Sequence, residues 1–320
     1  MKIYDCEVLF RPENAELRFL PEGPIDLGNG RFSWVAIQHG ANALVGSLNV
    51  FDLAKGINTT YEMDGRPGFA FPSNAPNIFF VGIERRVTTF NLLSREYSQV
   101  QGNVDEDVEG TIINDGVMFS DGIVFGTKVL ESKTKRAGLY VLRFGTHSLT
   151  RLRSDQICSN GKVILEDADQ LRFLDIDSPT KTVVEYTLDG NFICEPRVVL
   201  DLRGATDVPD GMVAAPDGQS VIIAFYNPND APHGEARQYS LLTGEVECVW
   251  RTDLAPQVTC PLLIEHNEKV KLVLTTAVER MPPEKFERHP NSGCIFVGDT
   301  QFHSVPDPNA ASIVREKVQP

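Results

Sequence analysis

The stretch Val208-Pro-Asp-Gly-Met-Val-Ala-Ala-Pro-Asp-Gly218 contains a carboxylate, a short β-rich run and a turn. Asp210 stands near its start, and the run ends at Asp217-Gly218, a dipeptide typical of turns. Units of the same kind recur across almost the whole chain. The fold is therefore predicted from this repeat before any functional site is considered.

One anchor residue marks the same point of each repeat, and successive anchors lie 45 to 50 residues apart. A period of about 40 to 50 residues is typical of propeller blades. The six anchors are Glu22, Pro67, Asn114, Asn160, Asp210 and Cys260.

Short runs of β-branched and aromatic residues follow each anchor, and turn residues separate them. They predict an all-β chain, specifically a six-bladed β-propeller with four-stranded blades. Residues 3–10 are expected to form a strand that closes the last blade. Residues 306–320 are expected to form a surface tail, so that residues 1–320 are a single domain.

The composition excludes several classes of function. A net charge of −14 and a pI near 4.9 argue against nucleic acid and anionic membranes as partners. No apolar stretch is long enough for a transmembrane helix, and no secretory signal is visible. The six cysteines are scattered without a CxxC pair, as expected of reduced thiols. These features predict a cytoplasmic protein.

Four anchors carry oxygen donors, namely Glu22, Asn114, Asn160 and Asp210. If the strand after each anchor is the innermost of its blade, these side chains meet at one mouth of the central channel. Carboxylate and amide oxygens are the ligands that hard divalent cations prefer. An alternative remains open, because Asn-Asp, Asn-Gly and Asp-Gly dipeptides are also typical of simple turns.

Four short motifs occur in register with the repeats. They are Glu22-Gly23-Pro24, Asn114-Asp115-Gly116, Ser159-Asn160-Gly161 and Pro209-Asp210-Gly211-Met212. In these motifs the sequence resembles the SMP-30/gluconolactonase/LRE (regucalcin-like) family, and the resemblance covers residues 22 to about 297.

The resemblance implies one divalent metal at the channel mouth, held by Glu22, Asn160 and Asp210. It also implies that Asn114 contacts substrate or a metal-bound water and that Glu131 contacts substrate. The substrate would be a sugar lactone, another lactone or an organophosphate. The chain departs from the animal members at two positions. Ile112 replaces a sugar-binding Arg, and Lys128 replaces a Met and is expected to place a cation near the substrate.

We therefore expect a metal-dependent hydrolase that opens a small lactone of the gluconolactonase kind, with Asp210 as general base. Ca²⁺ is the first choice of metal, and Zn²⁺, Mg²⁺, Mn²⁺ and Fe are alternatives. A phosphotriester hydrolase on the same site, or a calcium-binding propeller without turnover, are the rival interpretations. The expected partner is a small lactone or ester, and the expected state is a monomer or homodimer.

Overall fold

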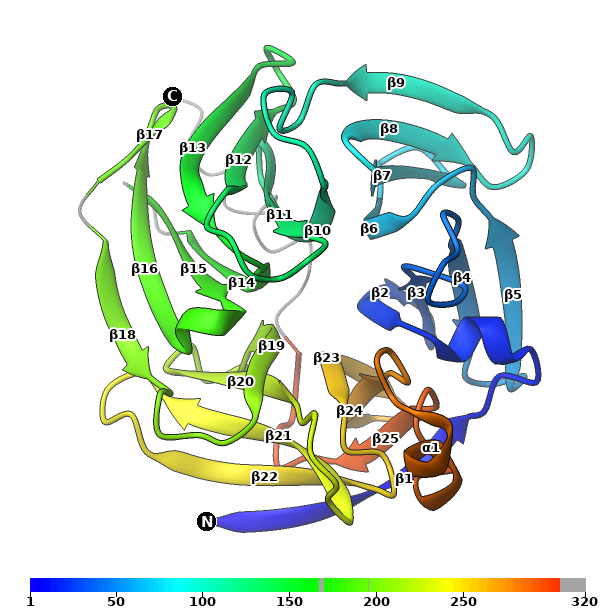
Figure 1. Ribbon diagram of the computed structural model, residues 1–320. Coiled ribbons are helices and arrows are strands. Elements are labelled where there is room, and N and C mark those ends of the chain that lie inside the picture. Colours follow the sequence, from blue (N-terminus) through cyan, green and yellow to red (C-terminus); the bar gives the residue numbers. More distant parts are fainter. Residues whose placement is uncertain (167–169, 195, 306–320) are drawn as a thin grey trace.

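The computed structural model describes residues 1–166, 170–194 and 196–305. Its strands form groups that stand around a common centre (Figure 1). The first four repeats form four separate sheets, and the last two share one eight-stranded sheet. This arrangement confirms the prediction of an all-β propeller.

The strand nearest the centre comes first in each repeat and contains the anchor. These inner strands are β2 (Pro21–Gly28), β6 (Pro67–Pro72), β10 (Thr111–Phe119), β14 (Ser159–Glu166), β19 (Val208–Ala214) and β23 (Val258–His266). The second strands are β3 (Arg31–Ala36), β7 (Ile78–Ile83), β11 (Gly122–Val129), β15 (Leu171–Asp177), β20 (Ser220–Tyr226) and β24 (Lys269–Thr276). The second strands are buried along most of their length because a sheet packs against each of their faces, which explains their continuous apolar runs.

The third and outer strands complete each sheet by antiparallel pairing. The third strands are β4 (Ser47–Asp52), β8 (Arg86–Asn91), β12 (Ala137–Arg143), β16 (Thr182–Asp189), β21 (His233–Ser240) and β25 (Ile295–Asp299). The outer strands are β5 (Ile57–Glu62), β9 (Tyr97–Gln101), β13 (Leu149–Gln156), the pair β17 (Phe192–Ile193) and β18 (Arg197–Asp201), β22 (Val246–Asp253) and β1 (Lys2–Phe10). The fourth sheet is therefore five-stranded, since β17 and β18 both pair with β16.

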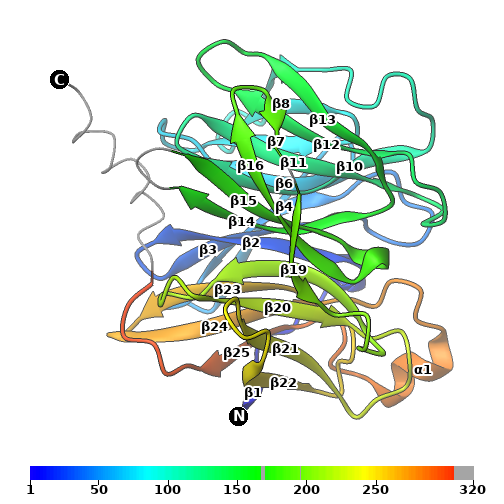
Figure 2. The same cartoon turned by 90° about the vertical axis from the view of Figure 1, so that its left-hand side faces the viewer.

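The amino-terminal strand β1 joins the last two sheets. Its second half, from Glu7, pairs antiparallel with β25, while its first half, Lys2 to Cys6, pairs in parallel with β22 of the neighbouring sheet. The view in Figure 2 places β1 beside β22, and in the eight-stranded sheet β1 lies between β22 and β25. The structure thus differs from six separate four-stranded sheets, because β1 is longer than the short strand β25 and extends onto β22.

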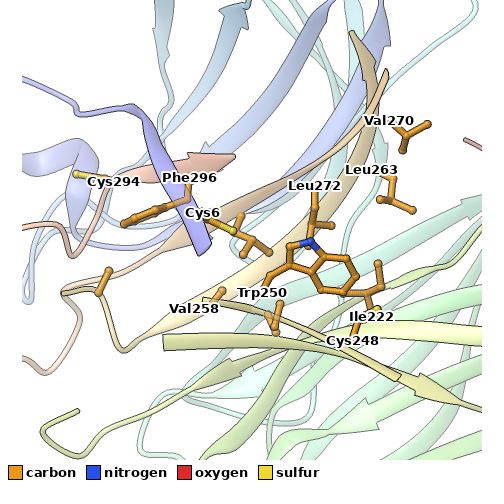
Figure 3. Close-up of a cluster of buried hydrophobic side chains, with 14 residues drawn as sticks. Cys6, Ile222, Cys248, Trp250, Val258, Leu263, Val270, Leu272, Cys294 and Phe296 are labelled. Carbon is orange, nitrogen blue, oxygen red and sulfur yellow. The ribbon is translucent and has the colours of Figure 1, made fainter. Parts of the chain in front are cut away.

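A buried cluster fills the space under β1 and holds the last two sheets together (Figure 3). Trp250 of β22 lies in its middle, with Ile222 on one side and Leu272 on the other. The Trp250 ring stacks on Tyr4 at a centroid distance of 5.5 Å, and its Nε1 donates to the carbonyl of Asp299 at 2.8 Å. These contacts bury large aromatic surface between β1, β22 and β25, which stabilises the closure of the ring.

In the part of the chain that the structure describes, helical structure is confined to the connections between strands. One short α-helix, α1 (Pro283–Arg288), lies between β24 and β25, and 3-10 turns cover Ala15–Arg18 and Ser178–Thr180. Within the described residues, no helix has the length and apolarity needed to cross a membrane. All six cysteines are free thiols. The predicted tail, residues 306–320, lies outside the described residues.

Candidate functional site at the inner strands

Each inner strand is interrupted by a β-bulge at its anchor. In β19, Asp210 and Gly211 together lie opposite a single residue of β20, between the pairs formed by Pro209 and Met212. The register shifts at the corresponding point of β2, β6, β10, β14 and β23. Because a bulge turns the neighbouring side chains out of their regular alternation, the same device redirects the anchors in all six strands.

Neighbouring inner strands contact each other around the whole ring, from β2 through β6, β10, β14 and β19 to β23 and back to β2. The backbones of neighbouring inner strands approach each other closely at the bulges. A Cβ on Gly161 of β14 would lie 2.7 Å from the carbonyl oxygen of Asp210 in β19, so only glycine fits there. Thr259 of β23 closes the ring by donating from its Oγ1 to the carbonyl of Pro21 at 2.6 Å. The bulges of neighbouring inner strands therefore lie close together around the ring.

The two asparagine anchors are bound directly to each other. Asn114 donates from Nδ2 to Oδ1 of Asn160 at 2.9 Å and to the carbonyl of Ser159 at 2.8 Å. Asn160 in turn donates from Nδ2 to Oγ of Ser178 at 2.8 Å. Both asparagines are buried. An amide oxygen has two lone pairs, so Oδ1 of Asn160 keeps one acceptor position for a further ligand.

The two acidic anchors have few partners. The Glu22 carboxylate accepts one hydrogen bond from the described residues, from the backbone N–H of Gly23 at 3.3 Å. The Asp210 carboxylate makes no hydrogen bond or ion pair with the described residues. Burial raises the pKa of both carboxyls well above their usual values, and the negative charge of Asp210 raises that of Glu22 further. Two poorly compensated carboxylates therefore lie near each other at the centre of the ring.

A third carboxylate at the centre, Asp115, was not predicted. It occupies the bulge of β10, its Oδ1 accepts the amide of Gly116 at 2.7 Å, and burial raises its pKa. Its negative charge also raises the pKa of Glu22, Asp210 and the Cys260 thiol. The sequence holds a signal for it: the residue after the anchor is glycine in four repeats (Gly23, Gly68, Gly161 and Gly211) and aspartate in the third.

Lys128 supplies positive charge to these carboxylates. It pairs with Ile112 across β10 and β11 and forms an isolated bridge to Cys158. Its charge opposes the rise in the pKa of Glu22 and Asp210 that burial causes. The side chain is partly buried and makes no ion pair with the described residues. Lys128 therefore lies close enough to Glu22 and Asp210 for its charge to act on both carboxyls.

Glu131, the remaining predicted contact to substrate, lies on an exposed turn after β11. Its Oε1 accepts from Arg136 at 3.0 Å and from Thr134 at 2.8 Å. The next residue, Ser132, accepts from Arg280 of the β24–α1 connection at 3.0 Å. Glu131 is thus held by its own turn, and its predicted contact with substrate stays a prediction.

The donor set fits a hard divalent cation. Two carboxylates and one amide oxygen with a free lone pair match the oxygen chemistry of Ca²⁺ and Mg²⁺. Among the described residues, no group of three or more His, Cys, Asp or Glu side chains is placed to hold a metal. Glu22, Asp115 and Asp210 together therefore do not form such a group. The predicted set of Glu22, Asn160 and Asp210 contains only two residues of those types, so its metal-binding role stays a prediction.

Two surface hollows lie away from the anchors. One of about 420 Å³ is lined by residues such as Glu84, Arg86 and Gly102, and the other, of about 440 Å³, by residues such as Asp26, Glu265 and Glu268. Neither contains an anchor residue, so the site described above is defined by its side chains and not by these hollows.

Comparison with protein-family models gives a match over residues 20–278 to the SMP-30/Gluconolactonase/LRE-like region. Comparison with curated proteins gives no match. Among solved structures, a calcium-binding protein, regucalcin, from Agrobacterium tumefaciens is 19% identical with a TM-score of 0.78, covering 95% of this chain and 99% of its own. A luciferin-regenerating enzyme is 19% identical with a TM-score of 0.75, covering 90% and 94%. A gluconolactonase from Xanthomonas campestris is 12% identical with a TM-score of 0.61, covering 91% and 88%.

Proposed function

The chain belongs to the SMP-30/gluconolactonase/LRE-like family, and from this premise we propose that it is a divalent-metal-dependent hydrolase that opens a small lactone. The observation that carries the proposal is the meeting of two poorly compensated carboxylates, Glu22 and Asp210, with the hydrogen-bonded pair Asn114 and Asn160. Removing such carboxylates from water is unfavourable unless a cation neutralises their charge or a reacting group exchanges a proton with them.

In this proposal Glu22, Asn160 and Asp210 hold the cation. Ca²⁺ is the first choice because all three donors are oxygens, and Mg²⁺, Mn²⁺, Zn²⁺ and Fe are the alternatives. When bound, the cation supplies Lewis acidity that polarises the lactone carbonyl.

Asp210 is the proposed general base. A water molecule attacks the carbonyl carbon and transfers its proton to the Asp210 carboxylate, and the bond to the ring oxygen then breaks. The ring oxygen takes up that proton, so the product is a hydroxy acid. A carboxylate at this position can accept a proton from the attacking water.

Asn114 and Lys128 are the proposed substrate contacts within the ring. Asn114 is fixed by its two donated hydrogen bonds, so its Oδ1 can orient a substrate hydroxyl without reorganisation. Lys128 offers an ammonium group to an electron-rich part of the substrate. Glu131 is proposed as a contact from the edge of the mouth.

Two alternatives remain as outcomes of the test. The similarity to a calcium-binding protein favours a propeller that binds Ca²⁺ without turnover. A phosphotriester hydrolase would use the same site, since the cation also polarises a phosphoryl oxygen. A cytoplasmic location and a monomeric or homodimeric state complete the proposal.

The test is metal analysis of the purified protein, followed by a pH-drop assay against aldonolactones, aliphatic lactones and a phosphotriester. We expect lactone hydrolysis that a chelator abolishes and a single cation restores. Ca²⁺ binding without turnover would instead support the calcium-binding alternative. Hydrolysis that survives complete removal of metal would contradict the proposal.

A further inference from the structure

A fully buried ion pair lies next to Asn160. Lys162 of β14 and Asp175 of β15 stand directly opposite each other, with 3.1 Å between Nζ and Oδ1 and side-chain exposures of 0% and 2%. Removing two charges from water is unfavourable, and an ion pair so deeply buried adds little stability compared with apolar residues of the same size. Its presence therefore calls for an explanation beyond stability.

All three hydrogen-bond donors of the Lys162 ammonium have partners. Besides Asp175 it donates to Oγ of Ser159 at 2.9 Å and to the backbone carbonyl of Asn160 at 2.7 Å, so its three donor hydrogens have three partners. Asp175 is satisfied as well, because it accepts from Ser159 at 3.2 Å and from Gln156. Gln156 itself is only half satisfied, since its buried Oε1 has no partner among the described residues. The two charged members are both paired, and a buried charge network of this kind is rigid.

The cluster acts at the bulge that redirects Asn160. The β14–β15 register shifts between Asn160 and Lys162, and a bulge leaves backbone groups without ladder partners. The carbonyl of Asn160 finds its partner in the Lys162 ammonium. The Asn160 side chain is held separately, by Asn114 at its oxygen and Ser178 at its nitrogen.

We propose that Lys162, paired with Asp175, is a positioning residue that fixes the Asn160 bulge and so aims the Asn160 amide oxygen at the centre of the ring. The proposal rests on the proposed function in one respect, since it gives Asn160 the role of cation ligand. Partners behind a ligand of this kind typically contribute about 10- to 100-fold to metal affinity.

The test uses the double variant Lys162→Met/Asp175→Asn, which removes both charges and keeps the side-chain volumes similar. Its matched control, Arg172→Met/Glu185→Gln, removes the ion pair between Arg172 and Glu185, 2.8 Å apart, further out in the same sheet. Neither control residue touches the bulge. The single variant Lys162→Met leaves Asp175 buried without its cation, and we expect it to have a lower melting temperature than the double variant.

Two readouts decide the proposal. By NMR, we expect the Asn160 side-chain amide protons of the double variant to exchange at least about tenfold faster than in wild type, with Ile164 further along β14 unchanged. By calorimetry with Ca²⁺ alone, we expect binding about tenfold weaker. The control should change neither quantity.

Unchanged exchange at Asn160 in a folded double variant would overturn the proposal. If exchange accelerates but wild type binds no cation, the positioning role stands and the proposed metal site fails. If exchange accelerates and the affinity for Ca²⁺ is unchanged, Asn160 is not a ligand and the aim assigned to Lys162 is refuted.

Discussion

The anchors from the third and fourth repeats differ from those of the first and fifth in how they are held. Asn114 and Asn160 are fixed by hydrogen bonds to each other and to serine residues. Glu22 and Asp210 have almost no partners, and burial raises the pKa of both. The amide half of the site, Asn114 and Asn160, therefore has its hydrogen bonds made within the protein. The carboxylate half, Glu22 and Asp210, has only the charge of Lys128 to oppose its own and is left undercompensated.

This difference assigns separate tasks to the two halves. The amide half sets the geometry, because neutral groups can be buried at little cost when each hydrogen bond is made. The carboxylate half supplies charge and reactivity, because buried carboxylates without partners are unstable until a cation or proton arrives. Variants in the two halves are therefore expected to change stability in opposite directions.

The largest effect is expected from Asp210→Asn. It removes the proposed base, so lactone hydrolysis should fall by about 10²–10⁴-fold, while some Ca²⁺ binding survives through Glu22 and Asn160. Initial rates with a matched calorimetric titration measure both. Asp26→Asn, at the far end of β2, is the control and should leave the rate unchanged. Full activity in Asp210→Asn would refute its role.

A smaller effect, of opposite sign on stability, is expected from Asn114→Ala. It leaves the oxygens of Asn160 and Ser159 without their donor, so the free energy of unfolding should fall by about 1–3 kcal/mol. Chemical denaturation of the chelated protein measures this change. If Asn114→Ala proves as stable as wild type, the amide half is not the rigid part of the site.

Without bound metal, the stability of the protein should also depend on pH because of the carboxylate half of the site. The raised pKa values of Glu22, Asp115 and Asp210 mean that stability from these groups is present below their usual pKa and is lost as pH rises through the raised values. Asp210→Asn lacks one of the three carboxyls. Its melting temperature should therefore exceed that of wild type by an amount that grows from pH 5 to pH 8.

We expect this difference in melting temperature to reach about 2–4 °C. A change of about 1 kcal/mol in the free energy of unfolding shifts the melting temperature of a long chain by this amount. Saturating Ca²⁺ should close or reverse it, because the cation compensates the wild-type carboxylates. Thermal denaturation at several pH values provides the measurement. A gap that does not vary with pH would show that the raised pKa values do not control stability.

The smallest effect is expected from Lys128→Met. The variant removes an ammonium group whose charge acts on Glu22 and Asp210. Charges a few Å apart in a partly solvated site interact by about 1 kcal/mol or more, so Ca²⁺ should bind about 3- to 10-fold more tightly. Lys133→Met, on the exposed turn after β11, is the control. Weaker Ca²⁺ binding in Lys128→Met would contradict the placement of this charge.

Much of the fold could be predicted because its signals are local. Turn residues and apolar runs recur at a constant period, and that period located the inner, second and third strands of every repeat. The sharing of one sheet by the last two repeats could not be predicted. It depends on how far β1 extends beyond β25, and the pairing of Lys2 with Cys248 joins residues at opposite ends of the sequence.

The site was predicted in part for the same reason. Glu22, Asn160 and Asp210 follow from the period, whereas Asp115 does not, because Asn-Asp-Gly is also typical of turns. Lys162 carries no local signal either, because a lysine in a strand is usually solvated. Its burial depends on Asp175 in the next strand, and cross-strand pairing is set by register and not by local sequence.

The sequence by itself determined that similar β-rich units stand in a ring and that the strand carrying each anchor comes first in its unit, because both follow from a repeated local pattern. Only the tertiary structure decided which side chains are compensated. The interactions that decide this all form between different strands. They are the hydrogen bond between Asn114 and Asn160, the ion pair of Lys162 and Asp175, and the repulsion between the charges of Glu22 and Asp210. Such contacts depend on distances of a few Å, which arise only once the bulged inner strands have packed together.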